Sequence, residues 1–171
     1  MAAGPARTQL TTTRSAGGPR WSPDGTQVAF VSKHGDTRSI WVIPAGGGDP
    51  TQLTTDQSNE SAVEWSPDGR QIVFTSTRAG SPDVWVMPAD GGEAAPLTSG
   101  VGNDFQPRWS LDGAWVPFCR FAMIGWMSGS CQPRGRAPTQ ITADEEGQAH
   151  LRWSPDGSRI AFLSTMGNRV L

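Results

Sequence analysis

The chain has 171 residues, 36% of them hydrophobic, with 21 glycines, 14 prolines and 8 tryptophans. This length and this abundance of turn formers suit one turn-rich domain. A net charge of −2 gives no indication of nucleic acid or a membrane surface as partner, and no apolar run approaches the roughly 18 residues of a transmembrane helix.

The first elements in chain order predict an incomplete start. Residues 1–7 are expected to be disordered and contain no apolar signal-peptide core. Residues 8–12 resemble residues 51–54 and 139–142, each of which ends a sequence unit. We therefore expect residues 8–12 to form the last strand of a preceding blade.

A five-residue motif, Trp-Ser-Pro-Asp-Gly, then organises the chain. Its tryptophans recur at intervals of 44 residues, at Trp21, Trp65, Trp109 and Trp153. A period of about 40–45 residues is typical of propeller or solenoid units. Ser-Pro-Asp-Gly is turn chemistry, because Pro presets φ, Asp bonds its own backbone and Gly takes the left-handed conformation. We interpret Asp24, Asp68 and Asp156 as turn residues rather than as a functional ring of carboxylates.

The first full unit, about 19–55, decides the architecture. Its strands are predicted to end at Trp21 and to cover 27–32, 39–43 and 51–54. In the second strand both sets of alternating side chains are apolar, so both faces of the sheet are buried. A sandwich would leave one face of each sheet wet, whereas a propeller blade packs both faces on its neighbours.

The later units repeat this pattern with one disturbance. The second unit spans about 63–99, the third about 107–143, and an incomplete fourth 151–171. The third has Leu111 in place of the motif proline, Pro117 inside its second strand, and Gly129 where the third strand should carry Trp. Reading-frame errors or drift across 117–137 are favoured over a specialised loop, because Pro in a central strand removes a ladder hydrogen bond. The prediction is an all-β fold, a partial β-propeller of four-stranded antiparallel blades.

These motifs resemble the repeat of TolB-like propellers. The Trp-Ser-Pro-Asp-Gly turn, the strands ending Phe-x-Ser, the Trp-Val strands, the Gly-Gly turns and Leu-Thr carry the resemblance over about 8–165. It implies one of two settings. TolB-like periplasmic proteins bind partner proteins of the cell envelope, and the propellers of prolyl-oligopeptidase-type serine peptidases gate a separate catalytic domain.

The sequence contains none of the motifs that a serine hydrolase or a metal site requires. No G-x-S-x-G elbow occurs, and the two histidines, His34 and His150, lie in predicted loops rather than beside a nucleophile. No metal-ligand spacing is present. Cys119 and Cys131 are expected to be unpaired thiols. We therefore expect no enzymatic activity, no cofactor and no metal.

Two groups of side chains are candidates for binding. Loops joining strands two to three and four to one emerge on one propeller face and are longer and more polar than the opposite turns. Their candidate residues are Lys33, His34, Asp36, Arg38, Asn59, Arg78, Asp83, Asn103, Asp104, Gln106 and Glu145. The residues before each motif Trp would line a channel and meet an anionic group, or pair between blades: Arg20, Glu64, Arg108 and Arg152.

The function expected is a non-enzymatic scaffold that binds a protein or peptide. The alternatives are a truncated gating propeller of a serine peptidase without its catalytic domain, and a truncated reading frame with no function of its own. Neither nucleic acid nor membrane insertion is expected, while open blade edges favour self-association. The location is periplasmic if the protein is TolB-like and a signal peptide is missing, and otherwise cytoplasmic.

Overall fold

A computed structural model describes residues 9–12, 15–122, 125–132, 136–142 and 148–164. Within these residues there are fourteen strands in four antiparallel sheets. The first blade contains β1 (Gly17–Trp21), β2 (Gln27–His34), β3 (Thr37–Pro44) and β4 (Thr51–Gln52). The second contains β5 (Glu60–Trp65), β6 (Gln71–Ser76), β7 (Asp83–Pro88) and β8 (Ala95–Pro96). The third contains β9 (Asn103–Phe105), β10 (Val116–Ala122), β11 (Gly125–Gln132) and β12 (Arg136–Gln140), and the fourth β13 (Gln148–Trp153) and β14 (Ile160–Ser164).

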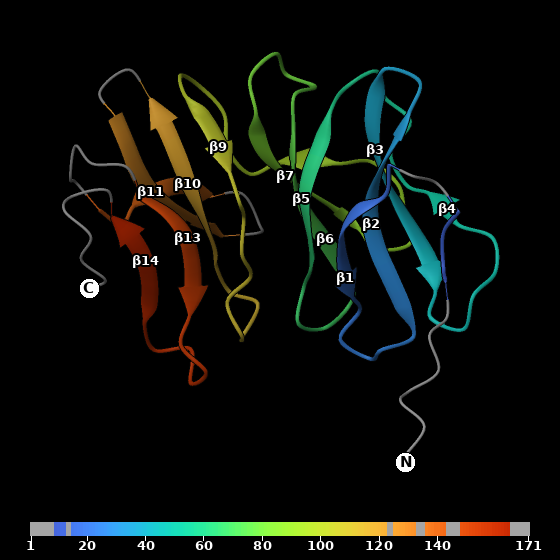
Figure 1. Ribbon diagram of the computed structural model, residues 1–171. Helices are drawn as coiled ribbons and strands as arrows, with labels where there is room; N and C mark the ends of the chain where they lie inside the picture. The colour runs from blue at the N-terminus through green and yellow to red at the C-terminus, as the bar shows by residue number, and fades with distance from the viewer. Residues whose placement is uncertain (1–8, 13–14, 123–124, 133–135, 143–147, 165–171) are drawn as a thin grey trace.

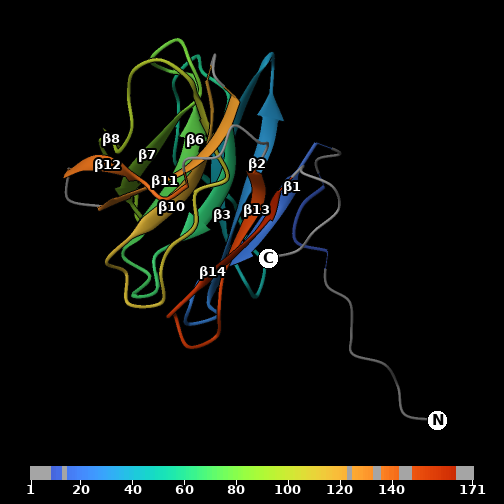
Figure 2. The same cartoon turned by 90° about the vertical axis from the view of Figure 1, so that its left-hand side faces the viewer.

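The blades follow one another in an arc, with the first and last at its two ends (Figure 1). The first strand of each blade packs on the blade before it: β5 on β1, β2 and β3, β9 on β7, and β13 on β10 and β11. Figure 2 views the arc from the left-hand side of Figure 1, with β13 and β14 of the fourth blade toward the viewer. This is the partial, four-stranded antiparallel propeller that the sequence predicts. The described part of the chain contains no helix of the length and apolarity needed to cross a bilayer.

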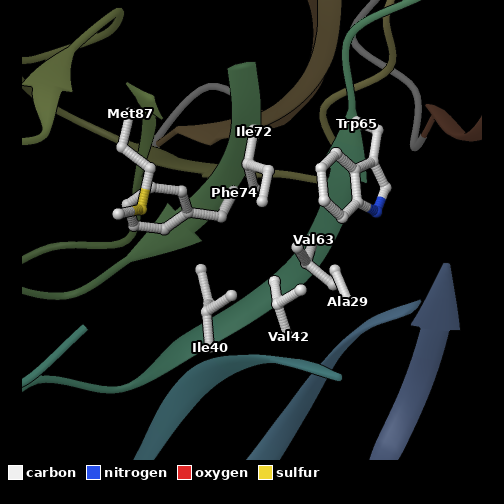
Figure 3. Close-up of a cluster of buried hydrophobic side chains, with 8 residues drawn as sticks. All are labelled: Ala29, Ile40, Val42, Val63, Trp65, Ile72, Phe74 and Met87. Carbon is white, nitrogen blue, oxygen red and sulfur yellow. The ribbon is translucent and has the colours of Figure 1, made fainter. Parts of the chain in front are cut away.

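The core lies between blades, as two-sided burial requires. One cluster joins Ala29, Ile40 and Val42 of the first blade to side chains of the second (Figure 3). The members from the second blade are Val63, Trp65, Ile72, Phe74 and Met87. A second cluster joins the far face of the second blade to Trp109, Val116 and Phe118 of the third. Burial of large apolar side chains at about 1.5–3 kcal/mol each is what holds one blade to the next.

The motif turns have the local bonding expected of turn residues. Ser22 Oγ donates to Asp24 Oδ1 at 2.6 Å, and the Thr26 N–H donates to the same oxygen at 3.1 Å. The other three turns repeat this Ser-to-Asp bond. Gly25 has a φ of 71°, the left-handed conformation that glycine adopts without steric cost. These carboxylates close their own turns, as the sequence predicts.

The third blade differs at its first strand. β9 stops at Phe105, whereas β1 and β5 continue to their motif tryptophans, Trp21 and Trp65. The Arg108 N–H still donates to the Pro117 carbonyl at 2.9 Å, but Pro117 has no N–H to return the bond. By contrast, β11 keeps the register of the other blades, since Phe118 faces Gly129 as Phe74 faces Trp85.

The start of the chain also differs from expectation. Residues 9–12 are not in a strand, while residues 1–8 lie outside the described part. Leu10 nevertheless packs on Val28, Phe30 and Ile43 of the first blade. Leu53 packs against the second blade in the same way. Leu10 therefore has the contact expected from a preceding blade without the strand pairing.

Candidate functional site

The β2–β3 and β6–β7 loops lie at the top of Figure 1, and the motif turns lie at the bottom. We call these two faces of the propeller the loop end and the turn end. At the loop end an open hollow of about 310 Å³ lies between the first and second blades. We call it the blade 1–2 hollow. Its walls include Arg20 of β1, Val31 of β2, Arg38 of β3, and Glu60 and Val63 of β5. It brings together one residue from each of the two predicted groups, Arg20 and Arg38.

A bulge in the innermost strand forms part of this hollow. The register shifts between Gly17 and Arg20 in β1 and between Ser61 and Glu64 in β5. Gly18 and Ala62, which line the hollow, have left-handed φ values of 61° and 53°. The equivalent residues of the next two blades, Gln106 and His150, have φ values of 54° and 60°. Bulges of this kind re-aim side chains beside functional sites.

The loops around the hollow are tied together by a single asparagine. The Arg38 backbone N–H donates to Asn59 Oδ1 at 3.2 Å, and the Asn59 N–H donates to Thr77 Oγ1 at 3.0 Å. The Thr77 N–H returns a bond to the Asn59 carbonyl at 3.3 Å. Asn59 thus joins the β2–β3, β4–β5 and β6–β7 regions. These hydrogen bonds fix the conformation of the rim of the hollow.

Arg78, another predicted binding residue, is engaged inside the fold. Its Nη2 lies 3.1 Å from Glu60 Oε1 and 3.1 Å from Asp56 Oδ2. Its guanidinium also stacks 4.9 Å from the Trp85 ring. Glu60 is only 1% exposed, and its Oε1 accepts a further bond of 2.6 Å from Ser58 Oγ. Arg78 therefore compensates a buried carboxylate and is not free to hold a ligand.

The third blade contains an equivalent ion pair. Arg120 Nε and Nη2 each lie 2.7 Å from one oxygen of Asp104, which is fully buried. Asp104 follows Glu60 by 44 residues and takes the same place in its blade. Asp83 is buried nearby, and this burial raises the pKa of its carboxyl group, with Asp104 adding to the rise. Asp83 and Asp104 thus lie under the predicted face rather than on it.

The predicted channel-lining residues divide into paired and unpaired. Arg108 Nη1 lies 2.6 Å from Glu64 Oε2, which ties the third blade to the second. This is the inter-blade alternative that the sequence left open. Arg20 and Arg152 donate only to carbonyls of their own strands, at 3.0 and 2.9 Å, and neither is in an ion pair with a described residue. They remain available to a partner.

The other predicted residues are distributed along the rim. Lys33, His34 and Asp36 are exposed at the β2–β3 hairpin tip, and Asn103 is half-buried in β9. Gln106 accepts a 3.2 Å bond from the His150 N–H of the next blade. Glu145 lies outside the described residues. The structure therefore concentrates exposed candidates on the first blade and its border with the second.

The described residues offer no set of catalytic groups. The hydroxyls of Ser22, Ser66, Ser110 and Ser154 all donate to turn aspartates. Cys119 is a free, buried thiol, and burial raises its pKa. No group of three His, Cys, Asp or Glu side chains in the described ranges could hold a metal ion.

Comparison with known proteins points to one family. A profile described as the TolB beta propeller domain matches residues 3–123. Among solved structures, one described as TolB from Agrobacterium tumefaciens is similar at a TM-score of 0.76 and 28% identity, over 87% of this chain and 54% of that one. TolB from Acinetobacter baumannii is similar at a TM-score of 0.72 and 21% identity, over 96% of this chain and 41% of that one. A puromycin-hydrolyzing peptidase of Mycobacterium tuberculosis is similar at a TM-score of 0.71 and 15% identity, over 96% of this chain and 29% of that one.

The chain corresponds to only part of each of these proteins. The chain spans about half of the Agrobacterium protein and less of the other two. At identities below 25% the last two similarities show the fold alone. No curated protein matches this sequence.

Proposed function

Because this chain belongs to the TolB β-propeller domain family, we propose that it is a non-enzymatic scaffold that binds a protein or peptide through its loop end. The blade 1–2 hollow is the centre of the proposed site. A periplasmic location, as in TolB-like proteins, is part of the same proposal. The proposal agrees with the motif serines, whose hydroxyls donate to turn aspartates.

The observation that carries this proposal is the pair of arginines in the hollow. Arg20 and Arg38 line it from two different strands, and neither is in an ion pair with a described residue. Arginine guanidinium groups suit carboxylates, which they bind through two parallel hydrogen bonds. The neighbouring Glu60 is already held by Ser58 and Arg78. The hollow is therefore suited to an acidic side chain or a carboxyl terminus on a partner segment.

A selection from a displayed peptide library tests the proposal directly. Peptides that bind the wild-type chain should be enriched in Asp, Glu or a free carboxyl terminus. Arg38→Glu and Arg20→Glu should each weaken the binding of these peptides by at least about tenfold, because each reversal puts a like charge beside the carboxylate of the peptide. Asp90→Lys, an exposed charge reversal at the turn end, is the matched control and should leave binding unchanged. Binders lost with Asp90→Lys and retained by both arginine variants would overturn the choice of face.

A further inference from the structure

A second open groove lies at the junction between the first and second blades, on its outer side. Its volume is about 580 Å³, which is within the usual range of ligand pockets. We call it the outer groove, because its lining residues belong to β7 and to the segments that follow β4, β6 and β7. The blade 1–2 hollow, by contrast, includes the innermost strands β1 and β5. Both blades have four described strands, so the outer groove is bounded by two full blades.

Part of the outer groove is apolar. Leu53 of the first blade and Trp85 and Met87 of the second blade line it. Leu53 and Trp85 are half-buried and pack on the core cluster between the blades, to which Met87 belongs (Figure 3). Long basic side chains bury their methylene stems on apolar surfaces while the charged end stays in water. This part of the groove is therefore suited to an unbranched apolar stem.

The outer groove also has an excess of negative charge. Asp56 and Glu93 line it, and both are exposed. Arg78 is the one cation among the described lining residues, and its Nη2 is shared between Asp56 Oδ2 and the buried Glu60 Oε1, at 3.1 Å each. Glu93 is in no ion pair with another described residue. Three carboxylates against one guanidinium leave a net negative charge, so the groove is complementary to a cation.

We propose that the outer groove binds a basic side chain of a partner segment. The apolar stem of this side chain lies over Leu53 and Trp85, and its charged end reaches the carboxylates of Asp56 and Glu93. The Trp85 ring already has the Arg78 guanidinium 4.9 Å from its centroid, so a cation beside this indole is compatible with the fold. The inference goes beyond the proposed function, because the blade 1–2 hollow is suited to a negatively charged group and the outer groove to a positively charged one.

An NMR titration with a blocked lysine, acetylated at its α-amino group and amidated at its carboxyl group, tests the proposal. The side-chain ammonium is then the only charge of the probe, so the arginines of the hollow do not attract it. The indole N–H signal of Trp85 should shift and saturate, with a Kd on the order of 1 mM for a probe of this size. Blocked norleucine, which has the apolar stem without the ammonium group, should bind at least about tenfold more weakly. A Trp85 signal that does not respond to lysine, or responds equally to norleucine, would overturn the proposal.

Charge variants locate the bound lysine in the outer groove. Glu93→Lys should weaken its binding by at least about fivefold, because a like charge then lines the groove. Asp56→Asn removes one carboxylate, keeps the Arg78–Glu60 pair and should weaken binding by about twofold to fivefold. Asp90→Lys is the matched control, since Asp90 is an exposed acid three residues from Glu93 and does not line the groove. All three variants change exposed side chains and should unfold at the wild-type temperature. Equal losses of binding in Glu93→Lys and Asp90→Lys would mean that the probe responds only to the net charge of the protein, and would overturn the proposal.

Discussion

The Phe118 ring lies across the backbone of Gly129, where a Cβ atom would be only 2.6 Å from its Cζ. In the other blades the residue facing the equivalent Phe is a tryptophan, Trp41 or Trp85. Phe118 thus uses the space left by the missing indole, and it is itself only 1% exposed. In the third blade a phenylalanine ring therefore covers the strand position that a tryptophan occupies in the first two blades.

Gly129→Ala should therefore destabilise the fold even though Ala is a better strand residue than Gly. Displacing the Phe118 ring should lower the free energy of unfolding by about 1–3 kcal/mol, as overpacking of a core does. Denaturant unfolding measures this. Phe118→Leu should make Gly129→Ala less costly in a double-mutant cycle. Gly17→Ala, in β1 with nothing within 4 Å of its added Cβ, should show no such loss, and equal losses at both glycines would contradict the Phe118 contact.

Removing Arg78 should destabilise the fold, because Glu60 would remain buried without its cation. Arg78→Met should cost about 3–5 kcal/mol of unfolding free energy, the usual result of breaking a buried ion pair. Glu60→Gln together with Arg78→Met should recover much of this, because the uncompensated charge is then gone. Lys33→Met, an exposed cation on the first blade, is the control. Full stability in Arg78→Met would mean that Arg78 is a surface residue after all.

Restoring the missing backbone hydrogen bond between Pro117 and Arg108 should stabilise the third blade. Pro117→Ala supplies the N–H that can donate to the Arg108 carbonyl. Leu111→Pro presets the turn and places a proline ring beside Gly157, as Pro67 lies beside Gly113. The double variant should gain about 1–3 kcal/mol. Thermal unfolding monitors the gain, with Pro50→Ala, at an exposed loop position, as control. An unchanged melting temperature would show that the missing bond does not limit stability.

The sequence could predict the blades because their chemistry repeats. Turn residues recur every 44 positions, and the strands between them are apolar on both faces, so position 129 could be placed at the Trp position of the third strand without coordinates. The bulge at Ala62, Gln106 and His150 could not be found, because these residues share a backbone conformation and no side-chain chemistry. The ion pair between Arg78 and Glu60 could not be predicted either. A charged loop residue looks solvated in a sequence, and its buried partner Glu60 lies 18 positions away with no motif joining them.

The motif aspartates should make stability depend on acid pH. Hydrogen bonds from the motif serines hold the pKa values of Asp24, Asp68 and Asp112 below the ordinary 3.8, and that of Asp156 at about 2. These groups bind protons more readily when unfolded, so their contribution is complete above about pH 4 and is lost as the pH falls toward 2. The raised pKa of Asp83 acts in the opposite direction. Denaturant unfolding between pH 5 and pH 2 should show a decline that Asp156→Asn makes shallower, and an unaltered slope in that variant would contradict the role of its turn.

A fluorophosphonate probe should leave the protein unlabelled. Such probes react with serines whose hydroxyl is activated by a neighbouring base. Ser22, Ser66, Ser110 and Ser154 each donate their hydroxyl proton to an aspartate two residues on, at 2.5–2.6 Å. No histidine is bonded to any of these four serines. An aspartate whose pKa is lowered is a poor base at neutral pH, so the hydroxyls keep their ordinary low reactivity. A serine peptidase labelled in parallel is the control, and stoichiometric labelling of one serine would require the binding-scaffold proposal to be abandoned.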